Sequence, residues 1–225
     1  MTSKSIFARI ASTVAIILSV AIAIVFISPK ADAASINIVN PGFEAIRLQK
    51  GGVAEKRVPG WQLYDPSRLI DGKDISSYAT FNPLPVFYPN GVSQGNNGAG
   101  IFIVKPPGSG VVALTQKLRA VLRRNTTYTL KVDIGNIAPS PDFPGIAGFP
   151  GYAVQLLAGG NVIAQDNDTV KPAEGAWLTS TVTYTTQAND RHLGKQLEIR
   201  LVNPLLREGE DTNFDNVRLD ATRKR

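Results

Sequence analysis

One carboxylate near the end of the chain occupies a position where a strand would carry an apolar residue. The segment Phe214–Ala221 alternates in the manner of a β-strand, which predicts that Asp215 shares a face with Val217 and Leu219. A carboxylate on an apolar face needs a metal ion, a hydrogen-bonding partner or a proton that it can donate. The position therefore indicates metal binding, a buried polar contact or acid catalysis.

A second group of oxygen atoms lies near the start of the chain, in the segment Asn40–Glu44. Its sequence, Asn-Pro-Gly-Phe-Glu, predicts a tight turn in which Glu44 and free main-chain carbonyls come together. Calcium takes about six to eight oxygen ligands, so this type of turn suits Ca²⁺. The alternative for Glu44 is an ordinary exposed turn residue.

The residues of several common catalytic sites are missing. The chain has no cysteine and one histidine, so neither a Cys–His pair nor a histidine-rich zinc site can form. That histidine, His192, follows Asn-Asp-Arg in a polar turn, which indicates a surface position. No glycine-rich phosphate-binding loop joins a strand to a helix.

The first 33 residues have the pattern of a secretory signal peptide. Basic residues precede an apolar run at 10–27, and Ala31-Asp32-Ala33 offers an A-x-A cleavage site. The alternative is an uncleaved membrane anchor, since roughly 20 apolar residues span a bilayer. We expect cleavage after Ala33, export to the periplasm or another extracytoplasmic compartment, and a single domain over residues 34–225.

The charge of the mature domain is mildly basic and does not indicate a nucleic-acid partner. The excess lies in two clusters, 119–124 and 223–225, and neither is interleaved with the aromatic residues that stack on bases. An exported chain without cysteine has no disulfide bonds. A structural metal ion would be a natural alternative means of stabilisation.

Alternation of apolar and polar residues predicts antiparallel strands along much of the chain. The predicted strands, with a hairpin at the double glycine 159–160, cover 111–118, 128–134, 152–157, 162–165, 177–186 and 197–201. Their short lengths and the turn residues between them predict an all-β fold. We expect a two-sheet antiparallel β-sandwich of the jelly-roll type.

Two long segments, 64–91 and 138–151, lack such periodicity. Loops of this length inside a compact domain are more often functional than accidental. The second loop combines several prolines with Phe143 and Phe149, which argues against a disordered segment. We expect these loops to shape a functional site.

Three short motifs, at 40–44, 59–61 and 214–217, resemble the calcium-binding jelly rolls of carbohydrate-binding modules. This resemblance implies a structural Ca²⁺ held by Glu44, the Gly42 carbonyl, a residue of the last strand and carbonyls of a further turn. It also implies one alternative function. The chain would then be a non-catalytic, calcium-stabilised carbohydrate-binding module of an exported protein.

A more extensive set of segments resembles the Stig cyclases. The shared segments follow one another in order and occupy 3–7, 27–31, 107–111, 127–133, 147–152, 192–194, 199–203 and 214–219. The resemblance implies a calcium-dependent homodimer, or a hetero-oligomer with related cyclases. It further implies that a small hydrophobic substrate, a geranylated isocyanovinyl indolenine, becomes a polycyclic hapalindole- or fischerindole-type alkaloid by Cope rearrangement and cationic cyclisation.

The same resemblance implies roles for individual residues. The acid of the family is an Asp of the last strand, and the Phe-Asp-Asn-Val match assigns that role to Asp215. Phe102 and Phe143 are the expected aromatic walls for a cation, and Ile101 or Phe102 stands where some members have tyrosine. A coordinated carboxylate is ionised, so an acidic Asp215 would leave Asn216 as the metal ligand of this strand. Whether Asp215 donates a proton or binds the ion stays open.

Overall fold

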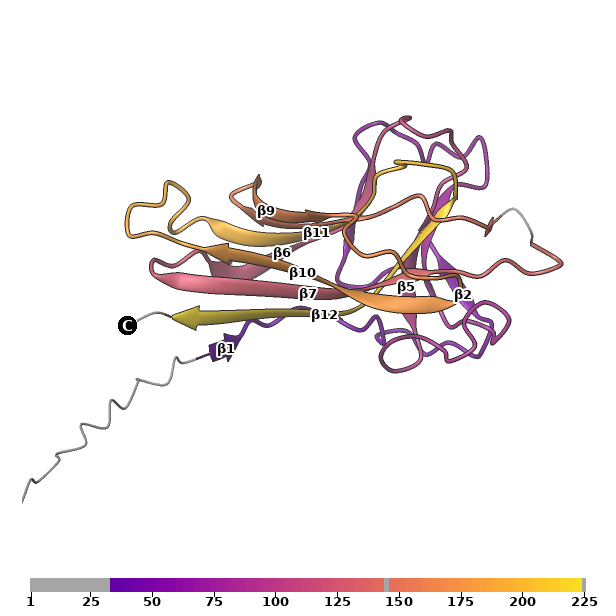
Figure 1. Ribbon diagram of the computed structural model, residues 1–225, viewed down its shortest axis with the longest axis horizontal. Coiled ribbons are helices and arrows are strands. Elements are labelled where there is room, and N and C mark those ends of the chain that lie inside the picture. Colours follow the sequence, from indigo (N-terminus) through magenta and orange to yellow (C-terminus); the bar gives the residue numbers. More distant parts are fainter. Residues whose placement is uncertain (1–32, 144–145, 224–225) are drawn as a thin grey trace, which may run out of the picture. The chain divides into compact units, whose positions relative to one another are not determined.

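The structure is a computed structural model that describes residues 33–143 and 146–223 (Figure 1). The predicted signal peptide lies outside these residues apart from Ala33, so its cleavage stays a prediction. Within the described ranges, no helix is long and apolar enough to cross a membrane. The regular elements of these ranges are all strands.

Two antiparallel sheets form the domain. The larger sheet has the strand order β10-β7-β12-β5-β4-β2, with β1 paired to β12, and the smaller sheet has the order β3-β6-β11-β8-β9. This arrangement confirms the predicted all-β, two-sheet antiparallel β-sandwich. The strands are β1 (Ala33–Ser35), β2 (Val53–Glu55), β3 (Gln62–Tyr64), β4 (Ser77–Phe81), β5 (Gly98–Phe102), β6 (Val112–Val121), β7 (Thr126–Asn136), β8 (Ala153–Ala158), β9 (Asn161–Asn167), β10 (Ala176–Thr185), β11 (Gln196–Asn203) and β12 (Asp211–Arg223).

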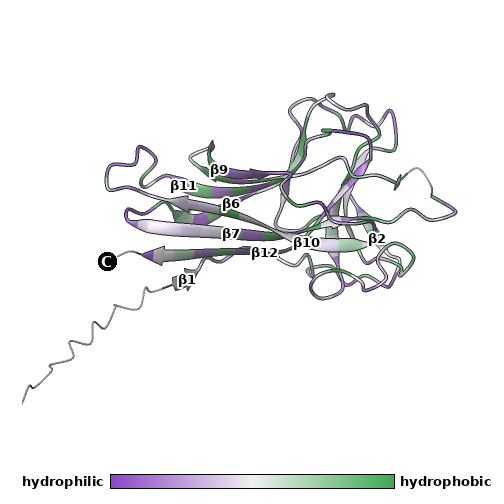
Figure 2. Ribbon diagram, in the orientation of Figure 1, coloured by the Kyte–Doolittle hydropathy of each residue, from purple (hydrophilic) through white to green (hydrophobic). Residues whose placement is uncertain are grey.

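The hydrophobic core fills the space between the sheets, and alternation along the strands explains it. In β7, the buried Leu130, Val132 and Ile134 belong to the core, while the residues between them face away from it. Figure 2 shows hydrophobic stretches alternating with hydrophilic ones along the strands of both sheets. The six strands predicted from such alternation correspond to β6 through β11. The expected loop at 64–91 is partly wrong, because it contains β4.

A β-bulge in β12 changes the side to which Asp215 points. Asp215 is opposite Asp133 and Arg218 is opposite Lys131, so three steps along β12 match two steps along β7. The extra residue, Asn216, adopts a left-handed conformation with φ of 52°. A bulge of this kind inserts one residue and reverses the alternation beyond it.

The predicted face of Asp215 is therefore wrong. Phe214 lies in the core together with Val217 and Leu219, although regular alternation would put it on the opposite side. Asp215 points to the outer face of the larger sheet, away from the core. After the bulge, the N–H of Val217 donates to the Pro41 carbonyl at 2.9 Å, which attaches the Asn40–Glu44 turn to the last strand.

Substitutions at Asn216 should test the bulge. A β-branched residue disfavours positive φ, so Asn216→Val should be less stable than Asn216→Gly by about 1–2 kcal/mol. Both variants lose the Asn216 side chain and its hydrogen bond to Asp133, so the comparison isolates the backbone. Urea denaturation measures the difference. Equal stabilities would contradict a strained conformation at this position.

Candidate active site

The outer face of the larger sheet carries a cavity of about 450 Å³ over strands β2, β4 and β5. The side chains of these strands that face away from the core form its floor, and the segment after β4 forms one wall. Most of the lining is apolar. The residues that line it include Val53, Ile75, Tyr78, Phe81, Leu84, Phe87, Phe102 and Ile137.

Two carboxyl groups line this cavity, those of Glu55 and Asp211. Asp211 begins β12 and is the direct cross-strand partner of Phe102 on β5. Burial raises the pKa of Asp211 to about 6, helped by the charge of Glu210 and opposed by a hydrogen bond from Asn213. A carboxyl with a pKa near neutrality is suited to general acid catalysis. Asp211 is thus the cavity's candidate acid.

Sequence reasoning missed Asp211. It follows Glu208, Gly209 and Glu210, an acidic run that is typical of a solvated turn. The available signal was the spacing, because Asp211 lies four residues before Asp215 and therefore shares its face in a regular strand. That relation holds in the structure, since the bulge begins only after Asp215.

Aromatic rings form part of the cavity lining. Phe102 and Phe81 come from neighbouring strands, and Phe87 comes from the segment after β4. Behind them, the Phe81 and Tyr88 rings stack with centroids 6.3 Å apart, and Tyr88 stacks on Trp177 at 4.8 Å. Such faces attract a positive charge when water is excluded.

The structure brings only one of the three expected pocket residues into the cavity. Phe102 lines it. Ile101 lies in the core with no exposed surface, because neighbouring residues of β5 point to opposite faces. Phe143 lies outside the lining and is 61% exposed, with its ring 6.3 Å from that of Phe87.

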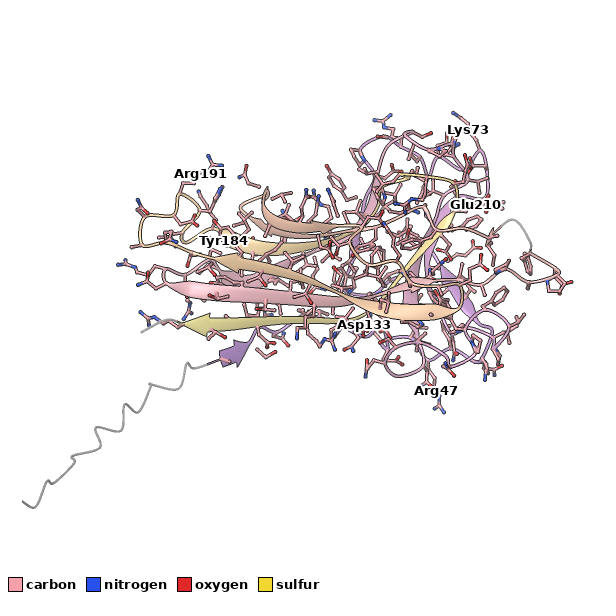
Figure 3. All side chains as sticks on the ribbon, viewed as in Figure 1. Arg47, Lys73, Asp133, Tyr184, Arg191 and Glu210 are labelled. Atoms are coloured by element: carbon pink, nitrogen blue, oxygen red, sulfur yellow. The ribbon has the colours of Figure 1, made fainter. Side chains whose placement is uncertain are left out.

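Asp215 is fully buried but does not line the cavity. Its Oδ2 accepts the N–H of Gln94 and its Oδ1 accepts the N–H of Asn216, each at 2.6 Å. Its pKa is raised to about 8, chiefly by burial and also by the charges of Asp133 and Glu44, although these two hydrogen bonds lower it. In Figure 3, Asp133, the partner of Asp215, lies well apart from Glu210, the neighbour of Asp211.

Both carboxylate oxygens of Asp133 have hydrogen-bond partners. It accepts hydrogen bonds from Ser93, Thr179 and Asn216, and Arg218 forms an ion pair with it at 3.0 Å. Burial alone would raise its pKa, but these contacts outweigh burial and hold it below the ordinary value. Asn216, expected as a metal ligand, thus directs its amide nitrogen to Asp133.

The Asn40–Glu44 turn meets the 93–97 segment in an oxygen-rich cradle. Glu44 Oε1 accepts the N–H groups of Asn96 and Asn97 at 2.7 and 2.8 Å. The space that a Cβ of Gly42 would fill is faced by the amide oxygen of Gln94 and by an oxygen of Asp215. Asn97 Oδ1 is buried without a hydrogen-bond partner.

This donor set fits a hard cation such as Ca²⁺, because its members are carboxylate and amide oxygens. In the described part of the chain, no three His, Cys, Asp or Glu side chains are grouped closely enough to hold a metal. A cation at this cradle would therefore also need amide or main-chain oxygens. Gly42, Glu44 and Asp215 are brought together here.

The fold and the cavity define a β-sandwich enzyme with a carboxylic acid in an aromatic pocket. The family model described as HpiC1 cyclase, HpiC1-like, matches residues 34–220. The chain therefore belongs to this family, the Stig cyclases, and is an indole alkaloid cyclase. This confirms the second resemblance and excludes the alternative of a non-catalytic carbohydrate-binding module.

Solved structures agree with the family. The Stig cyclase Fisc from Fischerella sp. TAU, in complex with (3Z)-3-(1-methyl-2-pyrrolidinylidene)-3H-indole, is 39% identical over 86% of this chain and 100% of that chain, with a TM-score of 0.81. A cyclase from the same source, in complex with 4-(1H-indol-3-yl)butan-2-one, is 38% identical over 85% of this chain and 100% of that one, with a TM-score of 0.79. Among curated proteins, no significant match is found.

The raised pKa of Asp215 predicts how stability depends on pH in the presence of EDTA. The folded state binds the Asp215 proton more tightly than the unfolded state does. The protonated group therefore makes its full contribution to the free energy of unfolding below about pH 4, and this contribution is lost as pH rises to about 8. Asp215→Asn should therefore gain stability relative to the parent as pH increases, by at most about 1.4 kcal/mol per unit. Urea denaturation between pH 5 and 8 measures this, and a constant difference would contradict the shift.

Proposed function

We propose that this cyclase converts a geranylated isocyanovinyl indolenine into a polycyclic hapalindole- or fischerindole-type alkaloid, by acid-assisted Cope rearrangement and cationic cyclisation. The observation that carries the proposal is the position of Asp211. It lines an apolar cavity beside Phe102, its cross-strand partner on β5. The indole compounds in the names of the two Fischerella complexes support a substrate of this class.

Asp211 is the proposed acid, in place of Asp215. Its neutral carboxyl gives one proton to the substrate, and the resulting carboxylate accepts one proton when the cyclised cation is discharged. The Cope step breaks one carbon–carbon σ bond and forms another. Substrate and product are therefore isomers, and the sequence needs no oxidant or reductant.

The cavity walls protect the charge that develops. Phe81, Phe87 and Phe102 present aromatic faces to a cation, and each such contact contributes about 0.5–2 kcal/mol. The apolar lining keeps water from adding to the cation before the ring closes. Ile75 and Leu84 extend this lining toward the solvent.

Calcium is the proposed cofactor, and it would be held by the cradle at the Asn40–Glu44 turn. Glu44, Asp215, the Gln94 amide oxygen and the Gly42 carbonyl are the proposed ligands. When bound, Ca²⁺ would supply the positive charge that keeps the two carboxylates ionised. These residues would then fix the turn against β12, whose first residue is Asp211.

The proposed assembly is a homodimer, or a hetero-oligomer with a related cyclase, exported through the leader at 1–33. The apolar edge of the cavity supports assembly, because Ile75 is 74% exposed and Val53 is 60% exposed. A second subunit would remove this surface from water. The leader pattern in the sequence supports export.

Asparagine variants should separate the roles of the two carboxyls. Asp211→Asn cannot donate the proton and should lower kcat at least about a hundredfold, the usual contribution of a general acid. Asp215→Asn, assayed with excess calcium, should keep most of the activity. Product formation from the indolenine is followed by chromatography and NMR. An active Asp211→Asn with an inactive Asp215→Asn would return the acid role to Asp215.

Calcium should stabilise the purified protein. Adding Ca²⁺ after EDTA treatment should raise the Tm, since a ligand that binds only the folded state shifts unfolding. Glu44→Gln should weaken calcium binding at least about tenfold, because it removes a charged oxygen ligand. Glu174→Gln, at an exposed carboxylate, is the matched control. Calorimetry that finds no difference between the two variants would remove Glu44 from the ligand set.

A lysine at the cavity edge should disrupt the dimer. Ile75→Lys places a charge in the proposed interface, whereas Val162→Lys places one on β9 of the other sheet, at a position 44% exposed. Sedimentation velocity should show a monomer for the first variant and the parental state for the second. A monomeric parent protein would contradict the proposed assembly.

A further inference from the structure

A chain of three polar side chains leads away from the cavity behind Asp211. The Tyr88 hydroxyl donates to Asn213 Oδ1 at 2.7 Å, and Asn213 Nδ2 donates to Asp211 Oδ1 at 2.9 Å. Tyr88 is 1% exposed and Asn213 is 0% exposed. Buried polar groups of this kind are costly unless they are paired, so these hydrogen bonds hold the three side chains in one arrangement.

The hydrogen bonds between these three side chains all run in one direction, from Tyr88 to Asp211. Burial raises the pKa of Tyr88 well above its ordinary value, and the charge of Asp211 adds to this effect, so the hydroxyl stays protonated and donates. The amide oxygen of Asn213 must accept the hydrogen bond from this hydroxyl, which turns the amide nitrogen toward Asp211. One carboxyl oxygen of Asp211, Oδ1, is thereby committed as an acceptor.

We propose that Asn213 and Tyr88 are positioning residues that keep the acid proton of Asp211 on Oδ2 and so determine which substrate atom is protonated. This inference rests on the proposed role of Asp211 as the acid. With Oδ1 occupied by the amide N–H, Oδ2 is the oxygen left for the substrate. Fixed geometry of this kind contributes to rate and to product choice, because a reacting group that is misplaced by about 1 Å can cost about a hundredfold.

Glycines make room for the chain on both neighbouring strands. A Cβ at Gly100 of β5 would lie 2.9 Å from Asn213 Nδ2 and 3.3 Å from Asp211 Oδ1. A Cβ at Gly135 of β7 would lie against the Tyr88 hydroxyl. Close contacts of this kind mean that any larger residue would displace the hydrogen-bonded groups.

Aromatic packing fixes the far end of the chain. The Tyr88 ring stacks between Trp177 and Phe81, with an interplanar angle of 27° to the first and 21° to the second. The Trp177 indole N–H donates to the Gly91 carbonyl at 3.1 Å, which holds that ring in turn. The Tyr88 hydroxyl therefore has little freedom to leave Asn213.

Few other groups near Asp211 can change their charge. Glu210 is adjacent in the chain and Glu55 lines the cavity from β2, whereas the Tyr78 side chain packs against the core. The amide N–H of Asn213 lowers the pKa of Asp211. Loss of that contact should therefore move the alkaline limb of the pH–rate profile, where Asp211 loses its proton, to higher pH, which a purely structural role would not do.

The test compares Tyr88→Phe and Asn213→Ala with Tyr128→Phe. Tyr128 is also buried, and its hydroxyl accepts the Arg123 N–H at 2.8 Å in a different part of the domain. The two positioning variants should lose about tenfold or more in kcat, with KM within about twofold of the parent. They should also give an altered ratio of isomeric products and an upward shift of the pH–rate break. Tyr128→Phe should change none of these.

The outcomes separate this inference from the proposed function. If Asp211→Asn keeps full activity, the proposed acid is wrong and the positioning role falls with it. If Asp211→Asn is inactive while both positioning variants match Tyr128→Phe in kcat, product ratio and pH profile, only the positioning role is overturned. Should Asn213→Ala fail to fold, Tyr88→Phe decides alone, because it removes a single oxygen atom.

Discussion

The single extra residue in β12 is the constraint on which the rest of the structure depends. The bulge at Asn216 lets Phe214 and Leu219 both enter the core while Asp215 turns to the outer face. It also brings the Val217 N–H to the Pro41 carbonyl and so attaches the first turn of the domain to its last strand. In a strand without the bulge, Asp215 and Leu219 would lie on the same face. Either Leu219 would then leave the core or Asp215 would enter it.

Two carboxyls on one face of β12, those of the partly exposed Asp211 and the buried Asp215, have different surroundings. Asp211 borders an aromatic cavity and has a pKa of about 6, whereas Asp215 lies against the Gln94 loop, near Glu44 and Asp133, and has a pKa of about 8. Environments that separate two acids in this way commonly separate their functions. The acid role proposed for the group at the cavity and the metal role proposed for the group at the oxygen-rich turn rest on the same physical argument.

Much of the fold could be predicted from the sequence, because strands such as β7 and β11 alternate regularly over many residues. The site was harder to predict. A bulge changes the alternation without an unambiguous sequence signal, so the face of Asp215 was predicted wrongly. Asp211 was not predicted as a site residue, because the acidic residues before it are typical of a solvated turn. Phe143 carried an aromatic signal, but its exposure depends on how a long loop folds, which local patterns do not determine.

The central claim is that Asp211, and not Asp215, supplies the proton. The most direct test is the pH dependence of kcat/KM for the parent enzyme, measured with the indolenine substrate and excess calcium, because Asp211 has a pKa of about 6. The account predicts a constant value below about pH 6 and a fall of about tenfold per unit above it. A profile that stays constant until about pH 8 would contradict it.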